Sequence, residues 1–138
     1  MTPILEVIKN KNTKIKPIWL MRQAGRYLPE FKAIREKNTD FIKLCLNSKL
    51  LSDITLQPIK RFGFDAAIVF SDILLVPHAL GQTVNFKKDY GPELGDLNLN
   101  ILDRIDSNDF TKKLEPFYKG LDLLKNNKLL NGRDVIGF

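Results

Sequence analysis

Cysteine and histidine are almost absent from this chain of 138 residues, which has one of each, Cys45 and His78. A single cysteine excludes an internal disulfide, so we expect a reducing compartment, the cytoplasm. One cysteine and one histidine also give no cluster with the spacing of metal ligands. Each fits a structural role better than a catalytic one, with Cys45 on the apolar side of a predicted helix and His78 in an apolar turn.

Long apolar runs are missing too, since no stretch approaches the roughly 18 residues that cross a bilayer. The first residues lack the basic and apolar regions of a secretory signal, so we expect no membrane partner. The net charge of +6 could indicate nucleic acid. The lysines are scattered, however, and no basic helix is interleaved with aromatic residues, so we expect a solvated basic surface and no nucleic acid.

Two phosphate-binding motifs are absent as well: no GxGxxG follows the first predicted strand, and no GxxxxGK[ST] occurs. What is present is an alternation of short apolar runs and amphipathic segments. Residues 17–21 (PIWLM), 65–70 (DAAIVF) and 135–138 (VIGF) have the pattern of buried strands. Strand, helices, strand, helix, strand is typical of parallel βα units. This order allows an open doubly wound sheet or part of a (β/α)8 barrel, and the missing glycine motif favours the barrel.

Capping residues and hydrophobic periodicity predict where the helices lie. Asp40 and Ser48 are the expected N-caps of two helices, and Gly63 and Gly81 the expected ends of two. A small hairpin with its turn at 91–92 is expected before the last helix. The predicted helices cover residues 3–9, 30–37, 41–46, 49–62, 73–80 and a stretch from Ser107 onward. The apolar positions of that last stretch are expected in the core: Phe110, Leu114, Phe117, Tyr118, Leu121 and Leu124.

Arginine is scarce and unevenly distributed. Six of the 22 basic residues are arginine, and Arg22, Arg26 and Arg35 fall within 14 positions. A chain that otherwise uses lysine has here the planar, forked guanidinium, which binds carboxylates through two hydrogen bonds. Arg22 follows the first predicted strand and Asp72 follows the second. Because catalytic groups of parallel barrels sit at the carboxyl ends of strands, we expect both residues at the same end of the sheet.

Structural roles for the same residues stay open at this point. An arginine after a strand can be a surface residue or part of an ion pair. Asp72 and Ser71 can simply cap a helix that begins at Ile73. Tyr27 and Phe31 can be ordinary core residues.

Three segments resemble the uroporphyrinogen decarboxylase family: 17–35 (PIWLMRQAGRYLPEFKAIR), 55–84 (TLQPIKRFGFDAAIVFSDILLVPHALGQTV) and the closing VIGF. The resemblance implies a (β/α)8 TIM barrel, of which this chain, as part of one domain (1–138), covers about the first three βα units. It implies a carboxy-lyase of haem biosynthesis that uses no metal or organic cofactor and forms a homodimer at full length. The implied reaction removes CO2 from the four acetate side chains of uroporphyrinogen III and gives coproporphyrinogen III.

By the same resemblance, Arg22 and Arg26 bind the carboxylates of the substrate. Arg22 also positions the carboxylate that departs. Asp72 accepts hydrogen bonds from the pyrrole N–H groups and stabilises the cationic ring that forms when a pyrrole carbon is protonated. The residues expected to contact substrate are Arg22, Gln23, Ala24, Gly25, Arg26, Arg35, Phe41 and Asp72.

Two other interpretations stay open. The Tyr, Ser and His that the family contributes from later strands have no positions in these 138 residues, so the chain could be an inactive truncated fragment or half of a split enzyme. The second interpretation is a corrinoid-linked methyltransferase, a relative within the same barrel superfamily. It would be expected to carry metal-binding His and Cys clusters, and the RQAGRY sequence at 22–27 argues against it.

Overall fold

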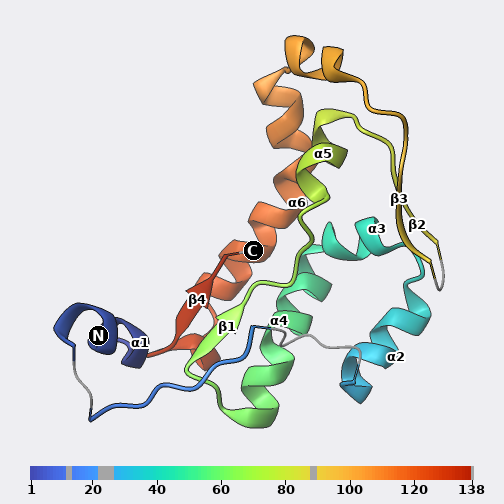
Figure 1. Cartoon of the computed structure of the whole chain (residues 1–138). Helices are drawn as coiled ribbons and strands as arrows, with labels where there is room; N and C mark the ends of the chain where they lie inside the picture. The colour runs from blue at the N-terminus through green and yellow to red at the C-terminus, as the bar shows by residue number, and fades with distance from the viewer. Residues whose placement is uncertain (12–13, 22–26, 88–89, 138) are drawn as a thin grey trace.

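The computed structural model describes residues 1–11, 14–21, 27–87 and 90–137 of the chain (Figure 1). Within them the structure is a mixture of helices and short strands. The helices are α1 (Pro3–Asn10), α2 (Pro29–Lys37), α3 (Phe41–Cys45), α4 (Ser48–Phe62), α5 (Leu75–Leu80) and α6 (Ser107–Lys125), with 3₁₀ turns η1 (Leu99–Arg104) and η2 (Lys128–Leu130). The strands are β1 (Ala66–Ile68), β2 (Val84–Lys87), β3 (Gly91–Leu94) and β4 (Asp134–Ile136).

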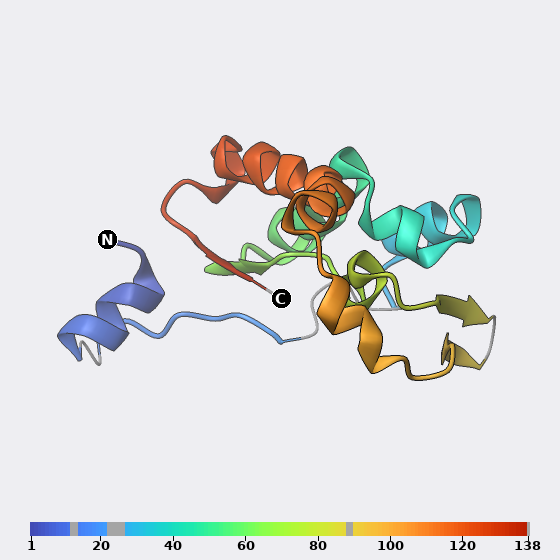
Figure 2. The same cartoon turned by 90° about the horizontal axis from the view of Figure 1, so that it is seen from above.

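Strands β1 and β4 pair in parallel, with Ala66 opposite Asp134 and Ile68 opposite Ile136. The chain between them includes α5 and α6, so this pair confirms the predicted βα connection between the second and third apolar runs. Figure 2 shows α4 and α6 together on one side of the strand pair. A buried apolar cluster fills the space between these helices and β1. Its members are Leu51, Leu56, Ile59, Phe64, Ala67, Val69, Leu124 and Leu130.

A second buried cluster lies where α2, α3 and α5 meet another side of α4. It is rich in aromatic residues, because Phe31 and Phe70 are buried there and Phe41 and Phe86 pack against them. The interpretation of Phe31 as a core residue is therefore confirmed, whereas Tyr27 is exposed. The cluster supports the end of β1, where the predicted carboxylate lies.

The prediction of a buried strand at 17–21 is wrong. Residues 15–20 run without regular secondary structure beside the start of β1, where the amide of Asp65 donates to the Ile18 carbonyl at 2.9 Å. The amide of Ile18 in turn donates to Asp65 Oδ2 at 2.7 Å. Ile18, Leu20 and Met21 are exposed. An apolar run becomes a buried strand only where other elements cover it, and the described structure leaves these side chains uncovered.

One predicted feature of the helix ends needs correction. The N-cap of α4 is Asn47, whose side chain accepts from the Leu50 amide, and not Ser48. Ser48 is the first helical residue, and its hydroxyl donates to the Pro116 carbonyl of α6 at 2.7 Å. The predictions for Asp40 and Gly63 are confirmed, since Asp40 accepts from the Lys43 amide and Gly63 ends α4 in the left-handed conformation at φ 67°.

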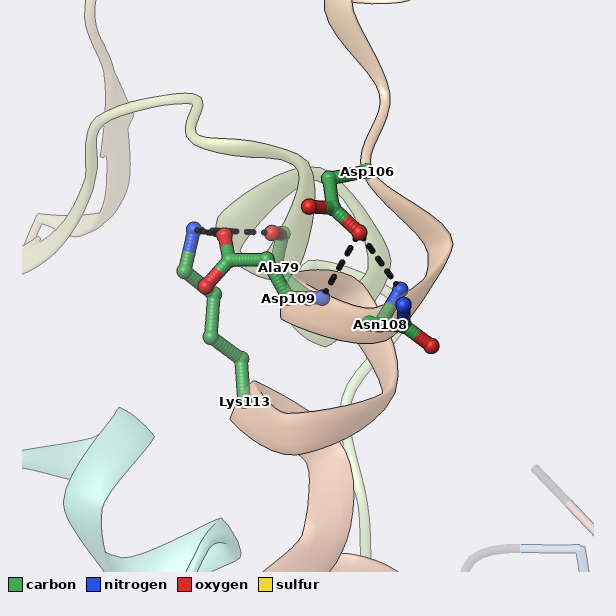
Figure 3. Close-up of polar contacts among 5 residues, drawn as sticks. All are labelled: Ala79, Asp106, Asn108, Asp109 and Lys113. Carbon is green, nitrogen blue, oxygen red and sulfur yellow. Dashed lines mark hydrogen bonds and ion pairs between the residues drawn. The ribbon is translucent and has the colours of Figure 1, made fainter.

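Helix α6 is confirmed, and most of its apolar positions face the core. Leu114 and Leu124 are buried, but Tyr118 is 41% exposed, so its predicted core position is wrong. Figure 3 shows how the beginning of α6 is fixed, with Asp106 accepting from the amides of Asn108 and Asp109.

Lys113 of α6 bridges its own helix and α5. It pairs with Asp109 at 2.8 Å and donates to the Ala79 carbonyl at 3.3 Å, which holds α5 against α6 (Figure 3). This contact stabilises the short helix that follows the predicted carboxylate.

The predicted hairpin forms, with β2 and β3 antiparallel. Gly91 and Pro92 belong to strand β3 itself, opposite Lys87 and Phe86, so their predicted role as the turn is wrong. Residues 88 and 89, between β2 and β3 in the sequence, lie outside the described part of the chain. In the described part, none of the helices has the length and hydrophobicity needed to cross a bilayer.

Candidate functional site

The predicted carboxylate-binding loop, Arg22, Gln23, Ala24, Gly25 and Arg26, lies outside the described residues. The predicted site residues that the structure describes are Arg35, Phe41 and Asp72. They come from α2, from α3 and from the segment after β1, and the question is whether the fold brings them together.

Asp72 lies four residues beyond β1, where the chain leaves the strand pair. The amide of Val69 still donates to the Ile136 carbonyl of β4 at 3.0 Å. The next amide, that of Phe70, donates instead to Thr55 Oγ1 in α4 at 2.9 Å. The chain therefore passes from a sheet contact to a helix contact within one residue, and Asp72 follows two residues later.

The carboxylate of Asp72 organises the turn into α5. Its Oδ1 accepts from the Leu74 amide at 2.9 Å, and its backbone carbonyl accepts from the Leu75 amide at 3.0 Å. The capping interpretation of Asp72 is therefore wrong, because α5 begins at Leu75, its N-cap is Leu74 and no side chain caps it. Asp72 instead closes the turn that precedes the helix. Because this contact uses one carboxylate oxygen, the other remains geometrically suited to a ligand.

A small pocket of about 210 Å³ adjoins this turn. One carboxylate and one hydroxyl in a largely apolar wall can fix an N–H donor of a flat apolar ligand. Its lining residues are Ser71, Asp72, Ile73, Leu75, Val76, Leu114 and Phe117.

A larger hollow of about 420 Å³ between α2 and α4 is lined by charged and amide side chains, including the ion-paired Glu30 and Arg61. That hollow contains none of the predicted site residues, so we place the candidate site at the Asp72 pocket.

Arg35 and Phe41 are in contact with each other. The guanidinium carbon of Arg35 lies 5.4 Å from the centre of the Phe41 ring, and Arg35 Nη1 also donates to the Asn38 carbonyl. A guanidinium over an aromatic ring in this range is attracted by the ring electrons. The Phe41 ring meets Phe70 edge-on at 5.8 Å. Through Phe70, the pair is linked to the segment that carries Asp72.

Cys45 lies within electrostatic reach of both charged residues. Burial above all, together with the negative charge of Asp72, raises the pKa of its thiol to about 12, and the charge of Arg35 opposes this shift. The thiol is fully buried. It therefore stays protonated at neutral pH and is no nucleophile, as predicted.

The described residues contain no group of three or more His, Cys, Asp or Glu side chains that could hold a metal ion. His78, in α5, is half-buried, and its backbone carbonyl accepts from the Gly81 amide at the end of the helix.

Sequence reasoning missed one polar residue of this region, Thr55. Thr55 is 1% exposed and lies in α4 between the buried residues Ile54 and Leu56 of the sequence. The signal was present, since a polar residue at a buried helix position needs a partner. That partner, the Phe70 amide, is 15 residues away and could not be identified from spacing.

These features define a class of α/β protein in which a parallel strand pair delivers a carboxylate to a pocket at its carboxyl end. The whole chain, residues 1–138, matches the sequence model described as Uroporphyrinogen decarboxylase (URO-D). The chain therefore belongs to the uroporphyrinogen decarboxylase family, as the motifs predicted.

Individual relatives carry the same name. The chain is 44% identical over 135 residues to the uroporphyrinogen decarboxylase of Chelativorans sp. (strain BNC1). It is 43% identical over 135 residues to those of Brucella anthropi and Brucella ovis. In each case the match covers 98% of this chain and 39% of the relative, so the chain spans about two-fifths of the length of these relatives.

Proposed function

We propose that residues 1–138 form the N-terminal, substrate-binding part of an enzyme that decarboxylates uroporphyrinogen III to coproporphyrinogen III. The observation that carries this proposal is the family match over the entire chain, together with relatives of that name at 43–44% identity. The complete enzyme would be a (β/α)8 barrel and a homodimer in the cytoplasm, and this segment would supply about three of its βα units.

The geometry around Asp72 supports this chemistry. Decarboxylation needs a place for the electron pair of the C–CO2 bond, and a pyrrole protonated on carbon can accept that pair. The acetate then loses CO2, its methylene carbon takes a proton to become a methyl group, and the pyrrole carbon gives up the proton that it had received, so that one proton is consumed for each CO2 released. A fixed carboxylate beside the ring favours the cationic intermediate and accepts from the pyrrole N–H groups. Asp72 is suited to this role, because its Oδ1 is fixed by the Leu74 amide in a half-buried turn.

The arginines would hold the acidic periphery of the substrate. Uroporphyrinogen carries eight carboxylates, four acetates and four propionates, and forked guanidinium groups bind such groups through paired hydrogen bonds. Arg22 and Arg26 would contact them directly, with the backbone of 23–25 against the ligand. Arg35 and Phe41 would form a further wall of the site, consistent with their contact at 5.4 Å.

The test uses a composite enzyme, in which residues 1–138 are followed by the part of the Chelativorans relative that lies beyond the matched region. The composite enzyme should convert uroporphyrinogen III to coproporphyrinogen III, as judged by chromatography of the oxidised porphyrins. The full-length Chelativorans protein is the positive control. Circular dichroism and a melting curve establish that the composite enzyme is folded.

A folded composite enzyme that binds no uroporphyrinogen and forms no product would overturn the proposal. A second arm mixes residues 1–138 with the remaining part made separately. Activity in that mixture would identify the chain as one half of a split enzyme, which is the alternative kept open by the sequence.

A further inference from the structure

Thr55 makes two hydrogen bonds from a position with no access to solvent. Its hydroxyl donates to the Leu51 carbonyl within α4 at 2.8 Å and accepts from the Phe70 amide at 2.9 Å. With the proton directed at Leu51, the oxygen lone pairs are left for Phe70. One side chain thus connects the middle of α4 to the end of β1.

The contact between Thr55 and Phe70 lies at the point where the chain leaves β1. The amide of Val69 donates to Ile136 of β4. Successive residues of an extended chain point their amides in opposite directions, so the Phe70 amide is directed away from β4 and toward α4. A buried amide has to find an acceptor, and here the acceptor is a side chain. The direction in which the chain leaves β1 therefore depends on the Thr55 hydroxyl.

Phe70 is held on its ring side as well. Its ring meets Phe31 and Phe41 at centroid distances of 5.8 Å each, in edge-to-face geometry. The backbone of Phe70 is thus fixed by Thr55 and its ring by two phenylalanines. Asp72 is two residues further along, and its own carboxylate closes the next turn through the Leu74 amide.

We propose that Thr55 is a positioning residue for Asp72: its hydroxyl fixes the Phe70 amide and thereby the place of the Asp72 carboxylate in the substrate pocket. This inference rests on the proposed function. Thr55 touches no substrate; it acts through the backbone of residues 70–72. Its role is separate from the stability of α4, because the hydroxyl makes a contact outside its own helix.

The experiment compares Thr55→Val and Thr55→Ser in the composite enzyme. Valine keeps the size of threonine and removes the hydroxyl, whereas serine keeps the hydroxyl. In Thr55→Val we expect kcat to fall by about tenfold to a hundredfold, because a misplacement of about 1 Å in a catalytic group has an effect of this size. KM should change by less than about threefold, since the arginines still bind the carboxylates. Thr55→Ser should retain most of the wild-type kcat.

Ile59→Val is the matched control for loss of stability. Ile59 is buried in the same helix but belongs to the other cluster, beside β1 and α6. Its shortening should lower the melting temperature and leave kcat unchanged. If kcat fell equally in Ile59→Val and Thr55→Val, the role of Thr55 would be merely structural and the proposal would be wrong.

A second readout does not depend on turnover. Hydrogen exchange of the peptide containing residues 69–74 should become about tenfold faster in Thr55→Val and stay near wild type in Thr55→Ser, the change expected for one lost buried hydrogen bond. Unchanged exchange and unchanged kcat in Thr55→Val would overturn the inference. Faster exchange in a folded composite enzyme without any decarboxylation would keep the structural link and reject the proposed function instead.

Discussion

At the scale of single residues, the carboxylate of Asp72 combines two roles. One oxygen accepts from the Leu74 amide and closes the turn that precedes α5. A carboxylate has a second oxygen with two further acceptor sites, and Asp72 lies at the wall of the candidate pocket. The turn contact is therefore compatible with substrate binding, since it orients the carboxylate and leaves the second oxygen for a ligand.

The change Asp72→Asn separates these two roles. Asparagine keeps an oxygen for the Leu74 amide but has no charge, so the turn into α5 should form normally. Loss of the charge should lower kcat of the composite enzyme by about a hundredfold to a thousandfold, or about 2.7–4 kcal/mol, the usual cost of removing one electrostatic stabiliser. The measurement is kcat together with the melting temperature. Near-normal turnover would leave Asp72 with a role only in the turn before α5.

The change Arg26→Lys tests whether the arginine pair is used for its shape. Lysine keeps the positive charge but cannot form a paired hydrogen bond with a carboxylate. We expect KM of the composite enzyme to rise by about tenfold to a hundredfold, corresponding to one lost charge-assisted hydrogen bond of about 1.5–3 kcal/mol. The melting temperature should stay the same. Arg104→Lys, on the exposed η1 turn, is the control. Equal KM values for wild type and Arg26→Lys would show that charge alone matters.

The predictability of these residues from sequence differs for clear physical reasons. Asp72 could be identified because it follows an apolar run directly, so its position at a strand end is a local property. Thr55 could not, because its partner Phe70 belongs to another element. The inert character of Cys45 followed from its apolar neighbours, but the influence of Asp72 and Arg35 on its pKa depends on tertiary structure.

At the scale of elements, the crossing of α4 and α6 depends on a glycine. A Cβ at Gly120 would lie 2.9 Å from Leu51 Cδ2 and 3.3 Å from the Ser48 carbonyl. Leu51 is fully buried, and the carbonyl belongs to the backbone of α4, so neither can move easily. The hydrogen bond from Ser48 to Pro116 joins the same two helices. Residues of both helices therefore allow and stabilise the close approach of α4 and α6.

The change Gly120→Ala should therefore destabilise the protein although alanine favours helices. Overpacking costs about 1–3 kcal/mol, and the gain in helix propensity returns about 1 kcal/mol. We expect a net loss of up to about 2 kcal/mol in the free energy of unfolding of the composite enzyme, measured with denaturant. In a Leu51→Ala background, Gly120→Ala should lower the free energy of unfolding by less, because the methyl groups of Leu51 that would clash with the new Cβ are gone. An increase in stability on Gly120→Ala alone would contradict the close packing.

The ends of most elements were predictable because they depend on local chemistry. Asp40, Gly63 and Gly81 act within a turn of their own positions, and each is where the sequence predicted it. That residues 17–21 do not form a buried strand was not predictable, since an apolar run indicates side chains that need cover but not which element covers them. The Ser48 error has a similar origin: its hydroxyl bonds to Pro116, 68 positions away.

At the scale of the whole molecule, the parallel pairing of β1 and β4 was predictable from the order of apolar runs and helices, because strands joined through a helix run in the same direction. The division of the core into two clusters was not, because it depends on which side of α4 each neighbour occupies. Leu51 and Ile54, three positions apart in the same helix, belong to different clusters.

The last prediction concerns residues 1–138 made as a separate polypeptide. Several large apolar side chains are exposed around the strand pair and the pocket: Ile18 is 62% exposed, Met21 74%, Ile73 73%, Val76 51% and Val135 44%. A two-stranded parallel sheet has open edges, and exposed edges and apolar surface favour aggregation. We therefore expect this polypeptide to be poorly soluble, or molten and able to bind a hydrophobic dye, and to form no coproporphyrinogen.

Sedimentation, near-ultraviolet circular dichroism and the decarboxylation assay check this expectation, with the composite enzyme as the folded control. The composite enzyme should be monodisperse and melt cooperatively, because its added part can cover the apolar side chains near Ile73 and Val135. If residues 1–138 alone were monodisperse, melted cooperatively and turned over substrate, the exposed surface would be a stable feature of the folded protein. The proposal that further strands complete the site would then be wrong, since these residues would already contain every group that the reaction needs.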